Sequence, residues 1–559
     1  MFWLTVLFYL LLVGVTALAR RRSKTWFSPA AFFGGVWCIL GGLPLAFSAI
    51  PVPPAGELFI AASVAALLAG EWAADRWLPG PREQKHSLPT RWPLIEWLLV
   101  ACVFIGLMTV LIDVGSLGRG PTALIYLTRS AYFLYWANQG GNWQEPGTAR
   151  VLVTATYVGP LLAGLLLGVR SAGWKRWAAL AVLVPGLFLT LILTTKSSFV
   201  LPLLLGVSAF LAARVATGRP PEITLRRAGA VAAVAVVLGA AAVASQMVRY
   251  EGQPRGQFMN VVTLLWSDLF PYLAVFSSWL QNGGWATTHP AFGYYSFAGL
   301  FDLLRIHVRP AGLYSEQAVV NGATYNIYTA FRGLIEDFTL PGALVVLGLA
   351  GFGARFAHVR ARAGDVRYIA PLAAFFVFTL WSWVVDIFIY NTILLAFALF
   401  GLYLWFATRP AFARRTERVD RVWAGADRRL APVFALVALL LAGSTVLAAT
   451  GLNPGCQGGS VTSDLPSPQP VGTSINFTAT SMNCSSPRYE WWIRAQPRGS
   501  WTRVQAYSDG SNRLVLDTSK MAPGIYTIDA WVEQVSSPVG LTGYETFGIL
   551  TYTLTPPSG

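Results

Sequence analysis

The chain is poor in the residues from which most enzyme centres are built. It has only 4 His and 4 Cys among 559 residues, and charged residues make up 12% of it. It contains no HExxH pattern, no Cys/His set with metal-binding spacing, no phosphate-cradling glycine loop and no GxSxG elbow. These absences argue against a zinc centre, a P-loop enzyme and a serine hydrolase of the common type. We therefore expect neither a metal nor another cofactor.

Long apolar runs are what the chain has in abundance. Hydrophobic residues make up 55% of it and its mean hydropathy is +0.53, which is more apolar surface than most soluble folds of this size bury. A run of about 20 apolar residues is long enough to cross the hydrocarbon core of a bilayer. About 12 runs qualify, at 2–19, 29–49, 57–74, 94–113, 150–169, 177–194, 198–213, 228–247, 340–357, 369–387, 390–407 and 431–450. The predicted fold over residues 1–450 is an all-α polytopic membrane protein of about 12 transmembrane helices.

Positive charge is distributed unevenly between the loops. The net charge is +15, but it gathers in short loops such as 20–24 and 409–429, so it does not indicate nucleic-acid binding. Cytoplasmic loops of membrane proteins carry an excess of Lys and Arg, which places both termini on the opposite, outward side. Positive residues follow the first run instead of preceding it, the reverse of a cleavable signal peptide. We therefore interpret that run as a retained span.

A polar tail begins near residue 451. Residues 451–471 read as a linker rich in proline, and 472–559 contain short alternating runs about ten residues apart, as in an immunoglobulin-like all-β sandwich. Tyr526 after Gly524 resembles the tyrosine corner of such domains, and either Trp491 or Trp492 is a candidate for the core tryptophan. Cys456 and Cys484 either form a disulfide or remain free thiols. The tail shows no catalytic cluster, and we expect it to act as a binding or spacing module, for polysaccharide or envelope partners.

Arginines mark the two long outward loops, at about 115–149 and 248–340. The fixed fork of donors on a guanidinium suits a diphosphate and does not lose its charge. Diphosphate leaving groups at a membrane surface belong to lipid-linked sugars. The candidate diphosphate and sugar ligands are Arg129, Lys196, Arg249, Arg255, Arg305, Arg309 and Arg332. Contact with lipid headgroups and simple solvation are the alternative roles, with Lys196 a snorkelling anchor.

The stretch that runs into the span at 340–357 carries a family resemblance. It reads Asn326-Ile-Tyr-Thr329, followed by Asp337-Phe338 and Gly342. In these residues the chain resembles the bacterial oligosaccharide repeat-unit polymerases, the O-antigen polymerase group. Ser28-Pro29 and the turn 194–198 also resemble that group, although Lys196 stands where many members have Arg and Thr339 where Gly is frequent. The resemblance covers residues 1–450 and leaves the tail outside.

The resemblance implies a reaction and a location. Members of this group are multi-pass proteins of the bacterial inner membrane that transfer a growing glycan from undecaprenyl diphosphate to an acceptor sugar on a lipid-linked repeat unit. They do so at the periplasmic face, as metal-independent glycosyltransferases, so the tail would also be periplasmic. The implied partners are undecaprenyl-diphosphate-linked oligosaccharide and membrane lipid, with a chain-length regulator or a flippase as further candidates.

Such a transfer needs a general base for the acceptor hydroxyl. The candidates are Asp302, Glu316, Glu336, Asp337 and His289. Glu316 has the best case because it lies between the arginines and the Asn326 motif. Asp337 is alternatively a cap of the span that follows. Tyr325 and Tyr328 are expected either to stack on sugar rings or to belong to an interfacial aromatic belt, and Asp113 and Asp386 are expected to be solvated.

Two other functions remain open at this point. An O-antigen ligase would use the same donor with a lipid A core acceptor, and the sequence separates it poorly from a polymerase. A lipid-linked oligosaccharide flippase or transporter would place ionisable residues and broken helices at mid-membrane. The chain shows no internal repeat, and its outward charges gather in loops. These features favour the polymerase.

Overall fold

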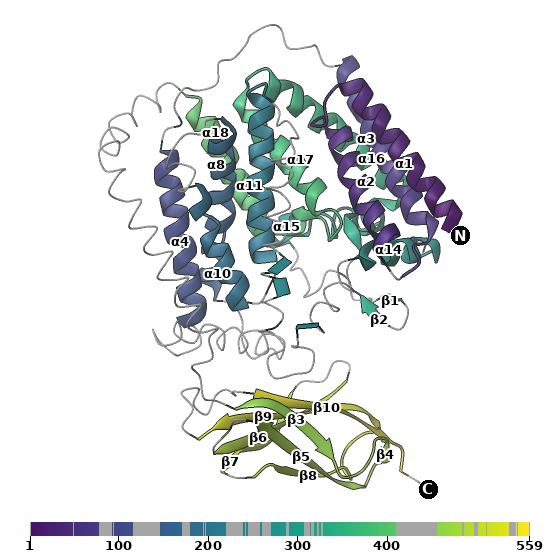
Figure 1. Ribbon diagram of the computed structural model, residues 1–559, viewed down its shortest axis with the longest axis vertical. Coiled ribbons are helices and arrows are strands. Elements are labelled where there is room, and N and C mark those ends of the chain that lie inside the picture. Colours follow the sequence, from purple (N-terminus) through teal and green to yellow (C-terminus); the bar gives the residue numbers. More distant parts are fainter. Residues whose placement is uncertain are drawn as a thin grey trace.

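The structure is a computed structural model with a helical domain and a β-domain (Figure 1). It describes residues 2–48, 50–77, 92, 94–115, 146–169, 179–193, 195, 197–219, 239–240, 242–243, 247, 258–259, 270–286, 290–306, 314, 318–320, 323–325, 328–409, 456–482, 484, 486–496, 501–509, 511–535, 544 and 546–557. All structural statements below concern these residues.

Seven helical segments of the described chain are long and apolar enough to cross a membrane. They are α1 (Phe2–Ser23), α2 (Pro29–Phe47), α3 (Pro54–Trp77), α4 (Ile95–Gly115), α7 with α8 (Gly147–Leu152 and Ala155–Val169), α11 (Ser197–Ala216) and α16 (Thr329–Arg362). Shorter apolar helices include α10 (Val184–Leu193), α17 (Ile369–Trp381) and α18 (Asn391–Ala407). The mostly helical class is confirmed, and seven candidate spans are consistent with a multi-pass membrane protein, but the number of 12 is not shown. The predicted span 431–450 lies outside the described residues, as does most of 228–247.

Helices α1, α2, α3 and α16 pack side by side (Figure 1). Arg22 and Arg355, near the ends of α1 and α16, both bond Asp75 on α3, at 3.4 Å and 2.7 Å. We call this the arginine end of the domain. At the other end, Thr5 Oγ1 donates to the Val52 carbonyl, 3.0 Å away. The helices α14 (Pro271–Gln281) and α15 (Ala298–Leu303) and the hairpin of β1 (Ala318–Val320) and β2 (Ala323–Tyr325) lie toward this second end, the hairpin end.

Glycines allow the closest helix contacts in this domain. A Cβ added to Gly70 on α3 would overlap the Gly348 carbonyl of α16, and one on Gly351 would overlap the Leu67 carbonyl. On α8, a Cβ at Gly164 would overlap the Gly206 carbonyl of α11. Small residues let helix backbones approach closely in membranes, where lipid supplies little hydrophobic drive for association.

Helix α16 begins earlier than the sequence predicts. The expected span was 340–357, whereas the helix starts at Thr329 and continues through a kink at Thr339, where φ is +66°. Pro341 lies two residues further on, and a proline inside a helix removes one backbone hydrogen bond and kinks or breaks the helix. Hydropathy missed the first turns because they carry Arg332, Glu336 and Asp337. The Asn326 motif therefore runs directly into a helix.

The β-domain consists of two sheets. The five-stranded sheet has the order β4-β10-β9-β6-β7, and the three-stranded sheet has the order β3-β5-β8. The strands are β3 (Gln457–Ser463), β4 (Gln469–Pro470), β5 (Ser474–Met482), β6 (Pro487–Ala495), β7 (Thr502–Asp509), β8 (Arg513–Asp517), β9 (Gly524–Gln534) and β10 (Thr546–Thr555). The short alternating runs expected within 472–559 correspond to the strands β5 to β10. The expected linker 451–471 is wrong in part, because β3 and β4 lie inside it and pair with β5 and β10.

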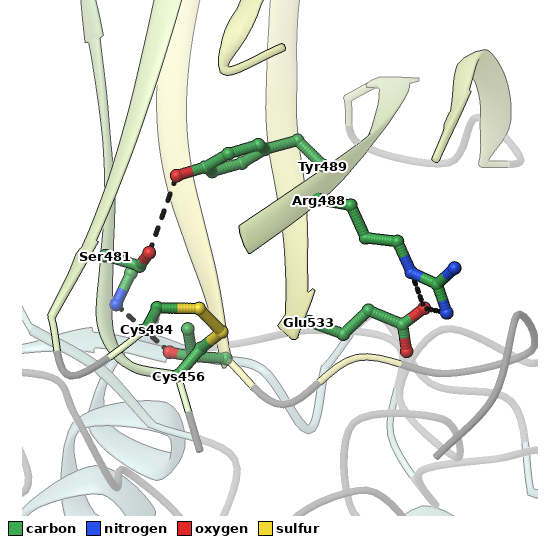
Figure 2. The surroundings of a disulfide bond; sticks show 8 residues. Cys456, Ser481, Cys484, Arg488, Tyr489 and Glu533 are labelled. Carbon is green, nitrogen blue, oxygen red and sulfur yellow. Dashed lines mark hydrogen bonds and ion pairs between the residues drawn. A yellow bond between two sulfur atoms is a disulfide. The ribbon is translucent and has the colours of Figure 1, made fainter. Parts of the chain in front are cut away.

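The β-domain has its own core and a covalent link. Trp491 is fully buried between the sheets, so it is the core tryptophan, whereas Trp492 is half-buried. The hydroxyl of Tyr526 donates to the Ala522 carbonyl at 2.7 Å, as expected of a tyrosine corner. Cys456 and Cys484 form a disulfide (Figure 2), which decides between the two alternatives left open by the sequence.

Candidate functional site

A buried ion pair lies on the first turns of α16, at the hairpin end. Arg332 Nε donates to Glu336 Oε1 at 2.7 Å, and the two side chains are only 4% and 5% exposed. The spacing of four residues places both on one helix face. The rings of Trp279, Tyr314 and Tyr328 surround the guanidinium carbon at 5.1, 4.2 and 4.0 Å. Such rings present their negative faces to a cation. The Arg332 guanidinium, the Glu336 carboxylate and the three rings therefore form one unit.

Asp337 fastens a loop to this helix. Its carboxylate accepts the backbone N–H groups of Tyr295 at 3.0 Å and Ser296 at 2.6 Å. The carbonyls of Glu336 and Asp337 accept from Ala291 and Phe292 in the same loop. The expectation that Asp337 caps the following span is therefore wrong. Its hydrogen bonds hold the loop 291–297 beside Arg332 instead.

Two further aspartates sit in tight contacts near this loop. Asp302 on α15 accepts from the Asn391 amide at 2.6 Å. Asp386 accepts from the backbone N–H of Phe388 at 2.9 Å and is 3% exposed. The prediction that Asp113 and Asp386 are solvated is wrong, since both are buried. The turn between α17 and α18 folds back against the helices, and linear hydropathy does not report such packing.

The structure brings together only some of the candidate ligands. Arg332 and Tyr328 belong to the unit described above, and Asp337 holds the loop beside it. Tyr328 is buried and does not lie in an exposed belt. Arg305 is exposed at the end of α15 with φ of +56°. Tyr325 ends the β1–β2 hairpin, paired with Ala318. The remaining candidates, Arg129, Lys196, Arg249, Arg255, His289, Arg309, Glu316 and Asn326, lie outside the described residues.

Sequence reasoning missed several residues of this region. Trp279 and Tyr314 were not singled out, because nothing in the sequence indicates that they would meet Arg332. Glu57 is fully buried in α3, and neither of its carboxylate oxygens has a hydrogen-bond partner among the described residues. A Cβ added to Gly41 would lie 3.0 Å from Glu57 Oε1. A carboxyl group in an apolar run is the signal that could have found it.

An apolar cavity of about 240 Å³ lies between α16 and α17. Its wall includes Leu347, Ala350 and Ala354 of α16 and Phe375 and Phe378 of α17. Asp386 also lines it. The cavity is therefore suited to hydrocarbon along most of its wall.

No group of three or more His, Cys, Asp or Glu residues that could hold a metal ion occurs in the part of the chain that the structure describes. Comparison with protein-family models, with curated proteins and with solved structures finds no match. What this site does must therefore be inferred from its own chemistry.

Proposed function

We propose that the helical domain is a metal-independent glycosyltransferase of the bacterial inner membrane. It would transfer a growing glycan from undecaprenyl diphosphate to an acceptor sugar on a lipid-linked repeat unit, at the periplasmic face. The observation that carries the proposal is the buried Arg332–Glu336 pair, enclosed by three aromatic rings at the hairpin end of a multi-pass domain. The resemblance of 326–342 to the repeat-unit polymerases supports it.

The residues take different roles in this proposal. Arg305 is exposed, so its guanidinium can contact a diphosphate and stabilise the charge that develops as it departs. Arg332 is enclosed by its rings and Glu336, and acts as a positioning residue for the aromatic wall. Asp337 braces the loop 291–297, which leaves Glu316 as the favoured general base. The apolar cavity between α16 and α17 suits the isoprenoid chain of the donor.

The β-domain fits the same location. The sheet orders, the buried Trp491 and the hydrogen bond of Tyr526 favour an immunoglobulin-like sandwich. Its disulfide is a feature of oxidising compartments, which supports a periplasmic position for the tail. The arginine end of the helical domain would then face the cytosol.

The test is the size of surface polysaccharide in cells that lack the gene and carry variants of it. Arg305→Ala should leave the protein inserted, because the side chain is exposed, but reduce long chains to single repeats. Arg249→Ala should do the same. Arg332→Ala should also shorten the chains, but it leaves Glu336 buried without its cation and lowers stability, so its chain length is compared at matched protein level. The matched control is Arg362→Ala, an exposed arginine at the other end of α16, which should leave chain length normal.

The same gel separates the competing functions. Normal chain lengths in all three variants, at normal protein levels, would remove the arginine proposal. Polymer that is made but not attached to lipid A in the deletion strain would indicate a ligase. Absence of lipid-linked units from the outer leaflet would indicate a flippase.

A further inference from the structure

The outer face of the five-stranded sheet carries an unusual set of side chains. Along β6, Tyr489 and Trp491 point into the core, so Glu490 and Trp492 lie on the opposite face. Along β9, Ile528 and Ala530 belong to the core, so Asp529 and Trp531 lie on that same outer face. Figure 2 shows the same alternation at the start of β6. Tyr489 points toward Ser481 of the other sheet, whereas Arg488 points toward Glu533 on the outer face.

Strand register brings four of these residues into one block. Trp492 stands opposite Asp529, and Glu490 stands opposite Trp531. Directly opposite residues on one face of an antiparallel pair are close neighbours. The two indoles therefore lie on one diagonal, with ring centroids 4.9 Å apart, and the two carboxylates lie on the other. Tyr544 extends the aromatic row, 4.5 Å from the ring of Trp531.

The carboxylates of this block are buried although the face is polar. Asp529 is 7% exposed and Glu490 is 3% exposed. Asp529 Oδ2 accepts from the indole N–H of Trp531 at 3.1 Å, but its Oδ1 has no hydrogen-bond partner among the described residues. Leaving a buried polar atom without a hydrogen bond costs about 1–3 kcal/mol. Such an atom calls for an explanation, and a hydrogen bond to a ligand is one.

We propose that this face, formed by Glu490, Trp492, Asp529 and Trp531, is a glycan-binding surface. One face of a sugar ring presents C–H groups, which suit the negative face of an indole. Sugar hydroxyls both donate and accept, so one of them can supply the hydrogen-bond partner that Asp529 Oδ1 lacks. Both indoles are half-buried, so each keeps surface for a ligand while its position is held. Arg503, 53% exposed and 3.6 Å from Glu490, borders the face with further donors.

Charge balance indicates what kind of glycan fits. Arg488 pairs with Glu533 at 2.6 Å, and Arg503 pairs with Glu490, so most charges on the face are compensated. A chain of neutral, hydroxyl-rich sugars therefore fits better than a polyanion. This inference does not depend on the transferase proposal, because the surface would hold a glycan whichever protein makes it.

The experiment uses the full chain in detergent. It is applied to an oligosaccharide array and to polysaccharide extracted from its native host, and binding to the strongest glycan is then titrated. Trp492→Ala, Trp531→Ala and Asp529→Leu, which removes both carboxyl oxygens at similar volume, should each weaken binding at least tenfold. Trp531→Phe should weaken it less, because a ring remains, and serves as the variant that preserves packing. The control is Val515→Ala, at a 65% exposed position on the other sheet, which should bind as the parent does.

Three outcomes would overturn the inference. The first is that the full chain binds neither array glycans nor host polysaccharide. The second is that binding occurs but survives all four substitutions on this face, and the third is that Val515→Ala weakens it equally. An Arg305→Ala variant separates this surface from the helical domain: it should bind glycan normally even if it abolishes polymer formation. Failure of one proposal thus leaves the other testable.

Discussion

The hairpin end of the helical domain and the outer face of the five-stranded sheet both bury carboxyl groups beside aromatic rings, but the two places satisfy them differently. At the hairpin end, Glu336 accepts from Arg332 and Asp337 accepts from two backbone N–H groups. On the β-sheet face, Asp529 has one oxygen on the Trp531 indole and another without a partner among the described residues. The comparison teaches that a buried, bonded carboxylate organises structure, whereas a half-satisfied one next to half-exposed rings marks a place for a ligand.

The largest expected difference between the regions concerns their ion pairs. Arg332→Met leaves Glu336 buried without its cation, and breaking a buried pair costs about 3–5 kcal/mol. Arg503→Met removes a largely exposed partner 3.6 Å from Glu490. Glu490 keeps the hydrogen bond from the backbone N–H of Tyr507, so this change should cost below about 1 kcal/mol. Circular dichroism during thermal unfolding in detergent reports the first, and pulse proteolysis of the β-domain reports the second. The double variant Arg332→Met/Glu336→Met should recover much of the loss. An equal loss of stability in Arg332→Met and Arg503→Met would contradict this difference between the two ion pairs.

The second difference between the two domains is the disulfide of the β-domain. Cys456 and Cys484 are 28 residues apart, and removing a cross-link over a loop of that length costs about 3 kcal/mol. Cys484→Ser should therefore lower the urea midpoint at which the β-domain becomes sensitive to pulse proteolysis, and a reducing agent should do the same to the parent. Cys38→Ser, in the helical domain, is the control and should leave that midpoint unchanged. An unaffected midpoint in Cys484→Ser would show that the β-sheets need no cross-link.

The smallest expected effect is the pH dependence of the stability of the β-domain, which tests Asp529. Burial raises the pKa of Asp529 to about 8, so the native state holds a proton that the unfolded chain releases near pH 4. The unfolded state is therefore favoured increasingly as pH rises from about 4 to about 8. Between pH 5.5 and 7.5 the β-domain should lose at most about 2–3 kcal/mol, at about 1.4 kcal/mol per pH unit. Asp529→Asn should flatten that slope in pulse proteolysis, and an unchanged slope would assign it to another group.

Much of the fold could be predicted because it follows from local pattern. Apolar runs located most of the described helices, and alternation located six strands of the β-domain. The start of α16 could not be predicted, because Arg332 and Glu336 lower the hydropathy of a segment that is nevertheless helical and buried. β3 was missed because Gln457–Ser463 is rich in Ser and Gly, so it resembles a linker until β5 pairs with it.

The sequence predicted some residues of the candidate site, but not which distant residues would surround them. Arg332, Asp337 and Tyr328 were named from sequence, but two of the rings that enclose the arginine, those of Tyr314 and Trp279, come from segments 18 and 53 residues earlier. Likewise, Trp492 and Asp529 meet only because β6 pairs with β9 in one register. No local pattern carries that information.

The amino-acid sequence by itself determined the multi-pass helical class, the polar β-rich tail and the sorting of positive charge, because each depends on composition and short-range periodicity. Tertiary structure alone decided that Arg332 is enclosed, that Asp337 braces a loop and that two tryptophans share a face with two carboxylates. These depend on which distant segments pack together, and burial and partner choice are properties of that packing.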